Sequence, residues 1–210
     1  MKKLYCLIIV IAAFLQVQGQ SQLLGGNAFL QGNFIEVGIN QCGSFGTTNN
    51  APAGFHARSG SAASPTTNAL NLGFVADTDK DGWNVGTPRY NGDYFLPFTP
   101  RVGWGVSFNG NHYRVERTNS SVSNCITLTP GVPPFPGSMI DVTSDGQQSV
   151  ATWAGSDNGL QLQKIITVKR NALYFTVKVK MKNTGATPLT NIFYGDYVNP
   201  DNGFFRNDLP

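Results

Sequence analysis

The sequence predicts an all-β protein, either one antiparallel β-sandwich or two packed β-subdomains, and three observations support this class. Glycine accounts for 24 of the 210 residues, whereas glutamate occurs only at Glu36 and Glu116. Charged residues make up only 13% of the chain, and helix-rich domains normally use more glutamate and lysine. After residue 20, no stretch of twelve residues has convincing helical periodicity, while short apolar runs alternate with turn residues.

The first 19 residues have the pattern of a secretory signal peptide. Lys2 and Lys3 precede an apolar core at residues 4–15, and small residues follow before the expected mature start at Gln20. The apolar core is too short for a membrane span, which needs about 20 apolar residues, and no later stretch is longer. We therefore expect a secreted or cell-surface protein without a membrane span.

Signal cleavage would leave two cysteines, Cys42 and Cys125, because Cys6 lies inside the signal. Disulfides form readily in the oxidising compartments to which such proteins are exported. The sequence is consistent with one Cys42–Cys125 disulfide and equally with two buried free thiols, because spacing alone does not bring two sulfur atoms together.

The predicted β-rich region at residues 20–128 contains short strands separated by loops. A long polar stretch around residues 59–68 is predicted to be a surface loop. Asp-Gly, Asn-Gly and proline separate short apolar runs, which indicates tight turns. The expected strands are 33–39, 72–76, 83–85, 94–96 and 103–108.

Four prolines within residues 129–137 exclude a central strand or helix there and predict a linker between two β-subdomains. In the following region, 138–210, apolar and polar residues alternate at 160–168 and at 173–182, with a turn between them, which predicts a β-hairpin. Residues 191–198 are expected to form another strand. The chain ends without an evident closing strand, so we expect the native protein to continue into downstream domains.

Several motifs resemble the amino-terminal region of large, modular, secreted bacterial cell-surface proteins of the adhesin type. The resemblance covers about half of the expected mature chain, and it implies a β-sandwich, often followed by Ig-like repeats and a sorting domain. It brings no catalytic residues with it. The similar segments are Gly-Phe-Val-Ala-Asp at 73–77 through Asp-Gly-Trp at 81–83, Gly-Asp-Tyr-Phe-Leu-Pro at 92–97, Gly-Trp-Gly-Val at 103–106, and the stretch from Asn-Thr-Gly at 183–185 to Tyr-Val-Asn-Pro-Asp-Asn at 197–202.

The run Asp-Thr-Asp-Lys-Asp-Gly at residues 77–82 matches the opening of a calcium-binding loop. The twelfth position of this loop is Pro88, so the glutamate of an EF-hand is missing. Two interpretations remain open: an isolated calcium turn, or an Asp-Gly turn that needs no metal. The candidate calcium ligands are Asp77, Asp79, Asp81, the Trp83 carbonyl and Asp93.

Aromatic side chains cluster between residues 83 and 113. Exposed rings would offer flat apolar faces on which sugars stack, whereas buried rings would belong to the core. Trp83, Tyr90 and Trp104 are the candidates for a glycan platform, because each one has glycine, asparagine or proline nearby.

The chain has a small net charge of +3, of which Lys2 and Lys3 lie in the signal, and this argues against nucleic acid as a partner. Lys178, Lys180 and Lys182 share one face of the predicted hairpin strand. That stripe suits acidic polysaccharide, but it is also typical of a solvated face that discourages edge pairing.

No motif for an activated nucleophile or a phosphate-binding loop is present in the sequence. A glycosidase needs two carboxylates across a cleft, for which Asp93 and Glu116 are one candidate pair. The sequence favours a non-catalytic extracellular module in adhesion or matrix organisation, which would contact a surface glycan or the extracellular matrix. A glycan-binding accessory module of a polysaccharide-processing protein is the alternative, and a hydrolase or lyase ranks third.

Overall fold

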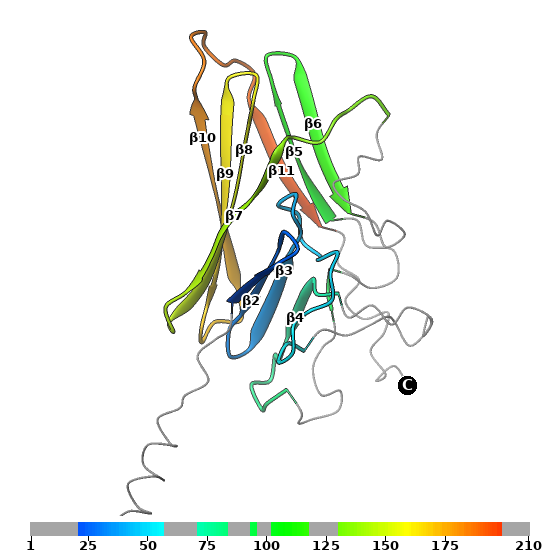
Figure 1. The fold of residues 1–210 in the computed structure, drawn as a ribbon, viewed down its shortest axis with the longest axis vertical. Coiled ribbons are helices and arrows are strands. Elements are labelled where there is room, and N and C mark those ends of the chain that lie inside the picture. Colours follow the sequence, from blue (N-terminus) through cyan, green and yellow to red (C-terminus); the bar gives the residue numbers. More distant parts are fainter. Residues whose placement is uncertain (1–20, 57–70, 84–92, 96–101, 118–129, 199–210) are drawn as a thin grey trace, which may run out of the picture.

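The computed structural model describes residues 21–56, 71–83, 93–95, 102–117 and 130–198. These residues form eleven strands in three antiparallel sheets, and they contain no helix (Figure 1). The all-β prediction is therefore confirmed. The expected signal at 1–19 and the expected loop at 59–68 lie outside the described residues.

The first sheet has the strand order β1-β2-β3-β4. Its two central strands are buried along almost their whole length, so both of their faces are covered. The strands are β1 (Ser21–Leu24), β2 (Asn27–Gln31), β3 (Ile35–Ile39) and β4 (Phe74–Ala76).

The second sheet has the order β10-β9-β8-β7 and contains the predicted hairpin as β9 and β10. Asn158 and Gly159, both with positive φ, connect β8 to β9 in the tight two-residue turn that suits an antiparallel hairpin. A β-bulge between Met139 and Asp141 leaves Ile140 exposed on β7. The strands are β7 (Gly137–Ser144), β8 (Gln148–Asp157), β9 (Leu160–Lys169) and β10 (Phe175–Asn183).

The third sheet has the order β11-β5-β6. β5 (Val102–Phe108) and β6 (Asn111–Arg117) form a hairpin through Asn109 and Gly110, which both have positive φ. The third strand, β11 (Phe193–Val198), comes from much later in the chain and pairs with β5. The expected strand at 191–198 is thus confirmed.

Two of the short strands that the sequence predicted are absent from the described residues of their segments. Asp93 makes an isolated bridge with Val75, but Tyr94 and Phe95 belong to no strand, so the prediction for 94–96 is wrong over its described part. Trp83 also lies outside any strand, and 84–85 are not among the described residues. Side-chain hydrogen bonds to Asp93 replace strand pairing in this segment, as shown below.

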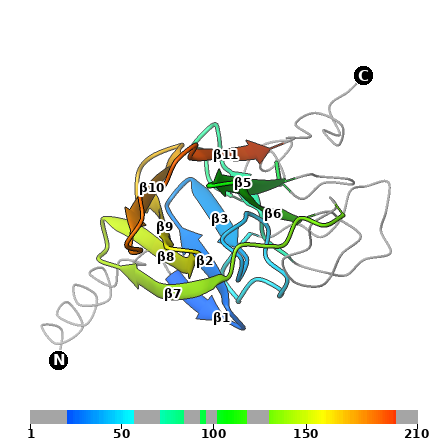
Figure 2. The ribbon, with the colours of Figure 1, turned by 90° about the horizontal axis from the view of Figure 1, so that it is seen from above.

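The three sheets make two layers. The second sheet forms one layer, and the first and third sheets lie one below the other to form the facing layer (Figures 1 and 2). A single cluster of buried apolar side chains contains residues from all three sheets. The arrangement is a β-sandwich in which one broad sheet covers two smaller ones.

The centre of the core is a pair of fully buried tryptophans, Trp104 on β5 and Trp153 on β8. Their ring centroids are 5.2 Å apart in an edge-to-face arrangement. Trp104 Nε1 donates a hydrogen bond to the Cys42 carbonyl, and Trp153 Nε1 donates one to the Gln41 carbonyl, each at 3.0 Å. Both indole N–H groups are therefore satisfied by adjacent residues of one loop.

The proline-rich segment contributes to this same core. Phe135 is buried, and its ring centroid lies 5.0 Å from that of Tyr113 and 6.2 Å from that of Trp104. Because β11 pairs with β5, the chain on the two sides of 129–137 also shares a sheet. The described part of this segment thus joins two parts of one core, although the sequence predicted a linker between subdomains.

Candidate binding site on the three-stranded sheet

The three-stranded sheet has one face toward the core and one face outward. On β5, Trp104, Val106 and Phe108 are buried in the core, and the residues between them point to the opposite face because side chains alternate along a strand. Gly103, Gly105 and Ser107 therefore occupy the outer face of the central strand.

The strand register arranges this outer face in three rows that run across the sheet. Directly paired residues on neighbouring strands lie side by side, so each row combines one residue from each strand. The rows are Tyr197–Gly103–Glu116, then Gly195–Gly105–Arg114, and finally Phe193–Ser107–His112.

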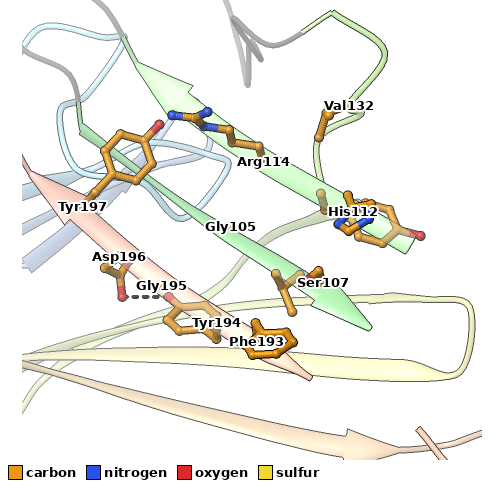
Figure 3. A pocket seen from close by; sticks show the side chains of 12 residues that line it. Gly105, Ser107, His112, Arg114, Val132, Phe193, Tyr194, Gly195, Asp196 and Tyr197 are labelled. Atoms are coloured by element: carbon orange, nitrogen blue, oxygen red, sulfur yellow. Dashed lines mark hydrogen bonds between the residues drawn. The ribbon is translucent and has the colours of Figure 1, made fainter. Parts of the chain in front are cut away.

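The middle row forms a depression in the outer face because two of its three members are glycines, which have no side chain. Among the described residues, a Cβ placed on Gly195 would have no atom within 4 Å, and one on Gly105 would meet only the Tyr113 carbonyl oxygen, at 3.1 Å. An open cavity of about 540 Å³ lies over this row, and Val132 forms part of its wall (Figure 3). The outer face thus carries a groove, named here the glycine groove, whose floor is Gly105 and Gly195.

Aromatic side chains flank the glycine groove at both ends. The Phe193 side chain is 69% exposed, which is unusual for a large apolar residue on a strand. At the other end, the Tyr197 ring lies over Gly103, where a Cβ would collide with it (Figure 3). Burial, with a smaller contribution from the nearby Glu116 carboxylate, raises the pKa of Tyr197.

The charged groups on this face are paired. Arg114 forms an ion pair with Glu116, whose side chain is 2% exposed, while that of Arg114 is 41% exposed. The Arg114 guanidinium also lies 5.1 Å from the centre of the Tyr197 ring. The pairing leaves Arg114 partly accessible as a hydrogen-bond donor beside the groove.

An ion pair between a buried lysine and a partly exposed aspartate links this sheet to the other layer. Lys164 of β9 is fully buried, and its Nζ is 2.7 Å from Asp196 Oδ1 on β11. The Tyr194 hydroxyl donates a hydrogen bond of 2.7 Å to Asp196 Oδ2. Burial lowers the pKa of Lys164, although the nearby Asp196 carboxylate acts in the opposite direction. For Tyr194, burial and, to a smaller extent, the negative charge of Asp196 both raise the pKa.

Lys164 has an aromatic environment as well as a carboxylate partner. Its Nζ lies 5.1 Å from the Trp104 ring centre and 5.9 Å from that of Tyr194. These contacts link β9 of one layer to β11 of the other. Because β11 supplies one side of the glycine groove, the Lys164–Asp196 ion pair joins that side to the opposite layer.

Two of the candidate calcium ligands, Asp77 and Asp93, accept hydrogen bonds from the backbone. Asp77 is buried, and its carboxylate accepts from Lys80 N at 3.1 Å and Gly82 N at 3.0 Å, while Asp79 and Asp81 are exposed. The Asp93 carboxylate accepts from the backbone N–H groups of 73, 74 and 95. Within the described ranges, no three His, Cys, Asp or Glu side chains gather at one point. Calcium binding here stays a prediction.

The aromatic candidates occupy different environments. Trp104 is fully buried in the core, so its assignment to an exposed glycan platform is wrong, because strand alternation turns its ring inward. Trp83 is partly exposed, stacks on the His56 ring at 4.2 Å and donates from Nε1 to the Asn33 carbonyl. Tyr90 lies outside the described residues.

His56 belongs to a buried polar cluster around Glu36 on β3. Glu36 is fully buried and accepts from the backbone N–H of His56 at 2.6 Å and from Gln31 Nε2 at 2.7 Å. The His56 Nδ1 atom lies 2.7 Å from Glu36 Oε1. This cluster fastens residues 55–56 to the first sheet, and sequence patterning did not single it out.

The remaining sequence candidates are accounted for as follows. Cys42 is buried, and Cys125 lies outside the described residues, so their pairing stays a prediction. Lys178, Lys180 and Lys182 are all exposed on β10, as the alternation predicted. Of the proposed acid pair, Asp93 binds backbone N–H groups of the first sheet, and Glu116 pairs with Arg114 on the third.

Comparison of the chain with protein-family models, with curated proteins and with solved structures finds no match. Across the part of the chain that the structure describes, no helix has the length and hydropathy needed to cross a membrane.

Proposed function

We propose that this chain is a non-catalytic extracellular β-sandwich module of a secreted bacterial surface protein, which acts in adhesion or matrix organisation through the glycine groove. The observation that carries the proposal is an open groove with a backbone floor and aromatic ends on the outer face of a rigid sheet. The predicted signal peptide supports the extracellular location.

The groove suits binding better than catalysis. Its acidic residues are engaged: Glu116 pairs with Arg114, and Asp196 binds Lys164 and Tyr194. Nucleophilic or acid–base chemistry needs an activated group at the reacting atom. The exposed Phe193 ring, by contrast, offers an apolar contact surface to a ligand.

A second candidate function is that of a glycan-binding accessory module in a polysaccharide-processing protein. The flat, partly aromatic shape of the groove favours it, because aromatic rings and a backbone floor both match a sugar ring. The two candidates share the groove and differ in whether the complete protein turns over a polysaccharide.

The proposed function is tested by binding of the labelled, exported protein to bacterial cells and to isolated extracellular matrix. Gly195→Leu fills the groove without a clash or backbone strain, because Gly195 does not have a positive φ and has open space above it. We expect this variant to lose at least tenfold in binding while its unfolding temperature stays within a few degrees of the wild type.

The matched control is Thr176→Leu, which adds the same side chain to an exposed strand position on β10 in the other layer. It should bind like the wild type. Equal binding by the wild type and Gly195→Leu would show that the groove is not the binding surface. No binding by the wild type to cells or matrix would overturn the proposed function itself.

A further inference from the structure

We propose that the glycine groove binds a neutral sugar ring, which stacks on Phe193 and makes hydrogen bonds to the polar side chains beside it. This inference rests on the proposed function and specifies its ligand.

The size of the groove follows from strand geometry. Phe193 and Tyr197 are four residues apart on β11, so their Cα atoms lie about 13 Å from one another. Gly195 stands midway between them and adds no side chain, which leaves room for a ring between the two aromatic groups. The cavity of about 540 Å³ lies within the usual range for small-ligand sites.

The groove lies over the face of the sheet, across β11, β5 and β6, whereas an extended peptide that pairs with an edge strand would lie in the plane of the sheet, beside β11 or β6. A peptide strand binds by pairing with unpaired backbone groups of an edge strand. The backbone of β5 already pairs on both sides, with β11 and with β6. The floor at Gly105 therefore offers shape and a flat surface but no free backbone ladder.

The apolar and polar groups are arranged as a sugar requires. The C–H face of a pyranose packs on an exposed aromatic ring, here Phe193. Ser107 and His112 share the row of Phe193, and Arg114 lies in the row of the two glycines. A hydroxyl both donates and accepts, so it can use the Arg114 guanidinium, the Ser107 hydroxyl and the His112 ring (Figure 3).

The charge of the groove favours a neutral sugar over an acidic one. Arg114 is neutralised by Glu116, and Asp196 is neutralised by Lys164, so these four charges sum to zero. The lysine stripe of β10 lies in the other layer and does not line the groove. A uronate or phosphate would therefore gain little attraction on this face.

The inference is tested with the full exported chain on an array of neutral and acidic oligosaccharides, followed by titration of each bound sugar at 0.05 and 0.5 M sodium chloride, about a threefold change in Debye length. We expect binding to neutral sugars only, with affinity that changes less than twofold with salt. Phe193→Ala and Gly195→Leu should each weaken it at least tenfold, whereas Lys180→Ala should leave it unchanged.

A second arm separates failure of this inference from failure of the proposed function. Bacterial cells are treated with periodate, which cleaves sugar diols, or with protease, before the labelled protein is added. Loss of binding after periodate supports the sugar inference. Groove-dependent binding that survives periodate, binding to acidic sugars that salt abolishes, or no binding to any arrayed neutral sugar would each overturn it, while groove-dependent adhesion to cells would still support the proposed function.

Discussion

Lys164 and Asp196 connect the two layers of the sandwich, with Lys164 Nζ 2.7 Å from Asp196 Oδ1 and the lysine fully removed from solvent. Tyr194, two residues before Asp196 on the same strand, holds the other carboxylate oxygen. A charged pair thus occupies a position where its neighbours on β9, Leu162 and Ile166, are apolar.

Removing one member of this pair should be far more destabilising than removing both. Asp196→Ala leaves a lysine buried without a counter-charge and should cost about 3–5 kcal/mol in the free energy of unfolding. Lys164→Met with Asp196→Leu replaces the pair by apolar groups and should recover most of that loss. Urea unfolding of the single and double variants measures the coupling. Additive losses would show that the two residues do not act as a pair.

Stability should fall as the pH rises above about 10, because burial raises the pKa values of Tyr194 and Tyr197. The unfolded tyrosines ionise near pH 10 while the folded ones remain protonated. Ionisation therefore stabilises the unfolded state relative to the folded state, and the free energy of unfolding falls. The contribution is complete below pH 10 and is lost toward the higher pKa of the folded state.

Lys164 acts in the opposite direction over a different pH range. Its pKa is lowered in the folded state, so the unfolded state binds more protons between that pKa and the ordinary value near 10.4, and stability rises with pH there. Urea midpoints from pH 8 to 11 should fall less steeply above pH 10 for Tyr194→Phe than for the wild type. In Lys164→Met, the urea midpoint should no longer rise with pH below about 10. Identical profiles for all three proteins would contradict the assignment.

Gly43→Ala should destabilise the fold more than Gly110→Ala. Both glycines have positive φ, 72° and 77°, so both substitutions carry similar backbone strain. A Cβ on Gly43 would also lie 2.9 Å from Trp153 Cγ, whereas one on Gly110 would have open space among the described residues. We expect an extra loss of about 1–3 kcal/mol for Gly43→Ala. Equal losses would mean that the core moves to accept the methyl group.

Glu36→Gln should cost about 1–3 kcal/mol, although it removes a charge and keeps the shape of the side chain. The amide NH₂ of glutamine would face donors that now bind the second carboxylate oxygen. Asp141→Asn, on exposed β7, is the control for charge removal and should change stability by less than about 0.5 kcal/mol. A loss no larger than that control would show that the cluster around Glu36 rearranges freely.

Strands were predicted best from the sequence where one face is buried and the other is exposed to solvent. The β9–β10 hairpin was predictable because apolar and polar residues alternate along both of its strands. β2 and β3 are covered on both faces, so alternation weakens, and β2 was not predicted. β8 was missed because small and polar residues such as Ser149 and Ala151 fill its inward positions.

The glycine groove could not be found from the sequence because it depends on strand pairing over long separations. Gly103, Gly105 and Gly195 are visible as glycines in strand-like segments, and such glycines often mark a close approach. Only the pairing of β11 with β5 places Gly195 beside Gly105. The aromatic prediction selected Trp104 for its glycine neighbours, but those glycines form the outer face and the indole is in the core.

The pairing of β5 with β11 also sets an order of events in folding. The β5–β6 hairpin is complete once residue 117 has left the ribosome, but the other neighbour of β5 begins only at Phe193. Until then β5 lacks its pairing with β11, and Lys164 of β9, which emerges earlier, lacks its partner Asp196. Closing such a long loop is slow compared with forming local hairpins. Both the groove and the cross-layer ion pair should therefore form late, after the chain as far as Val198 has emerged.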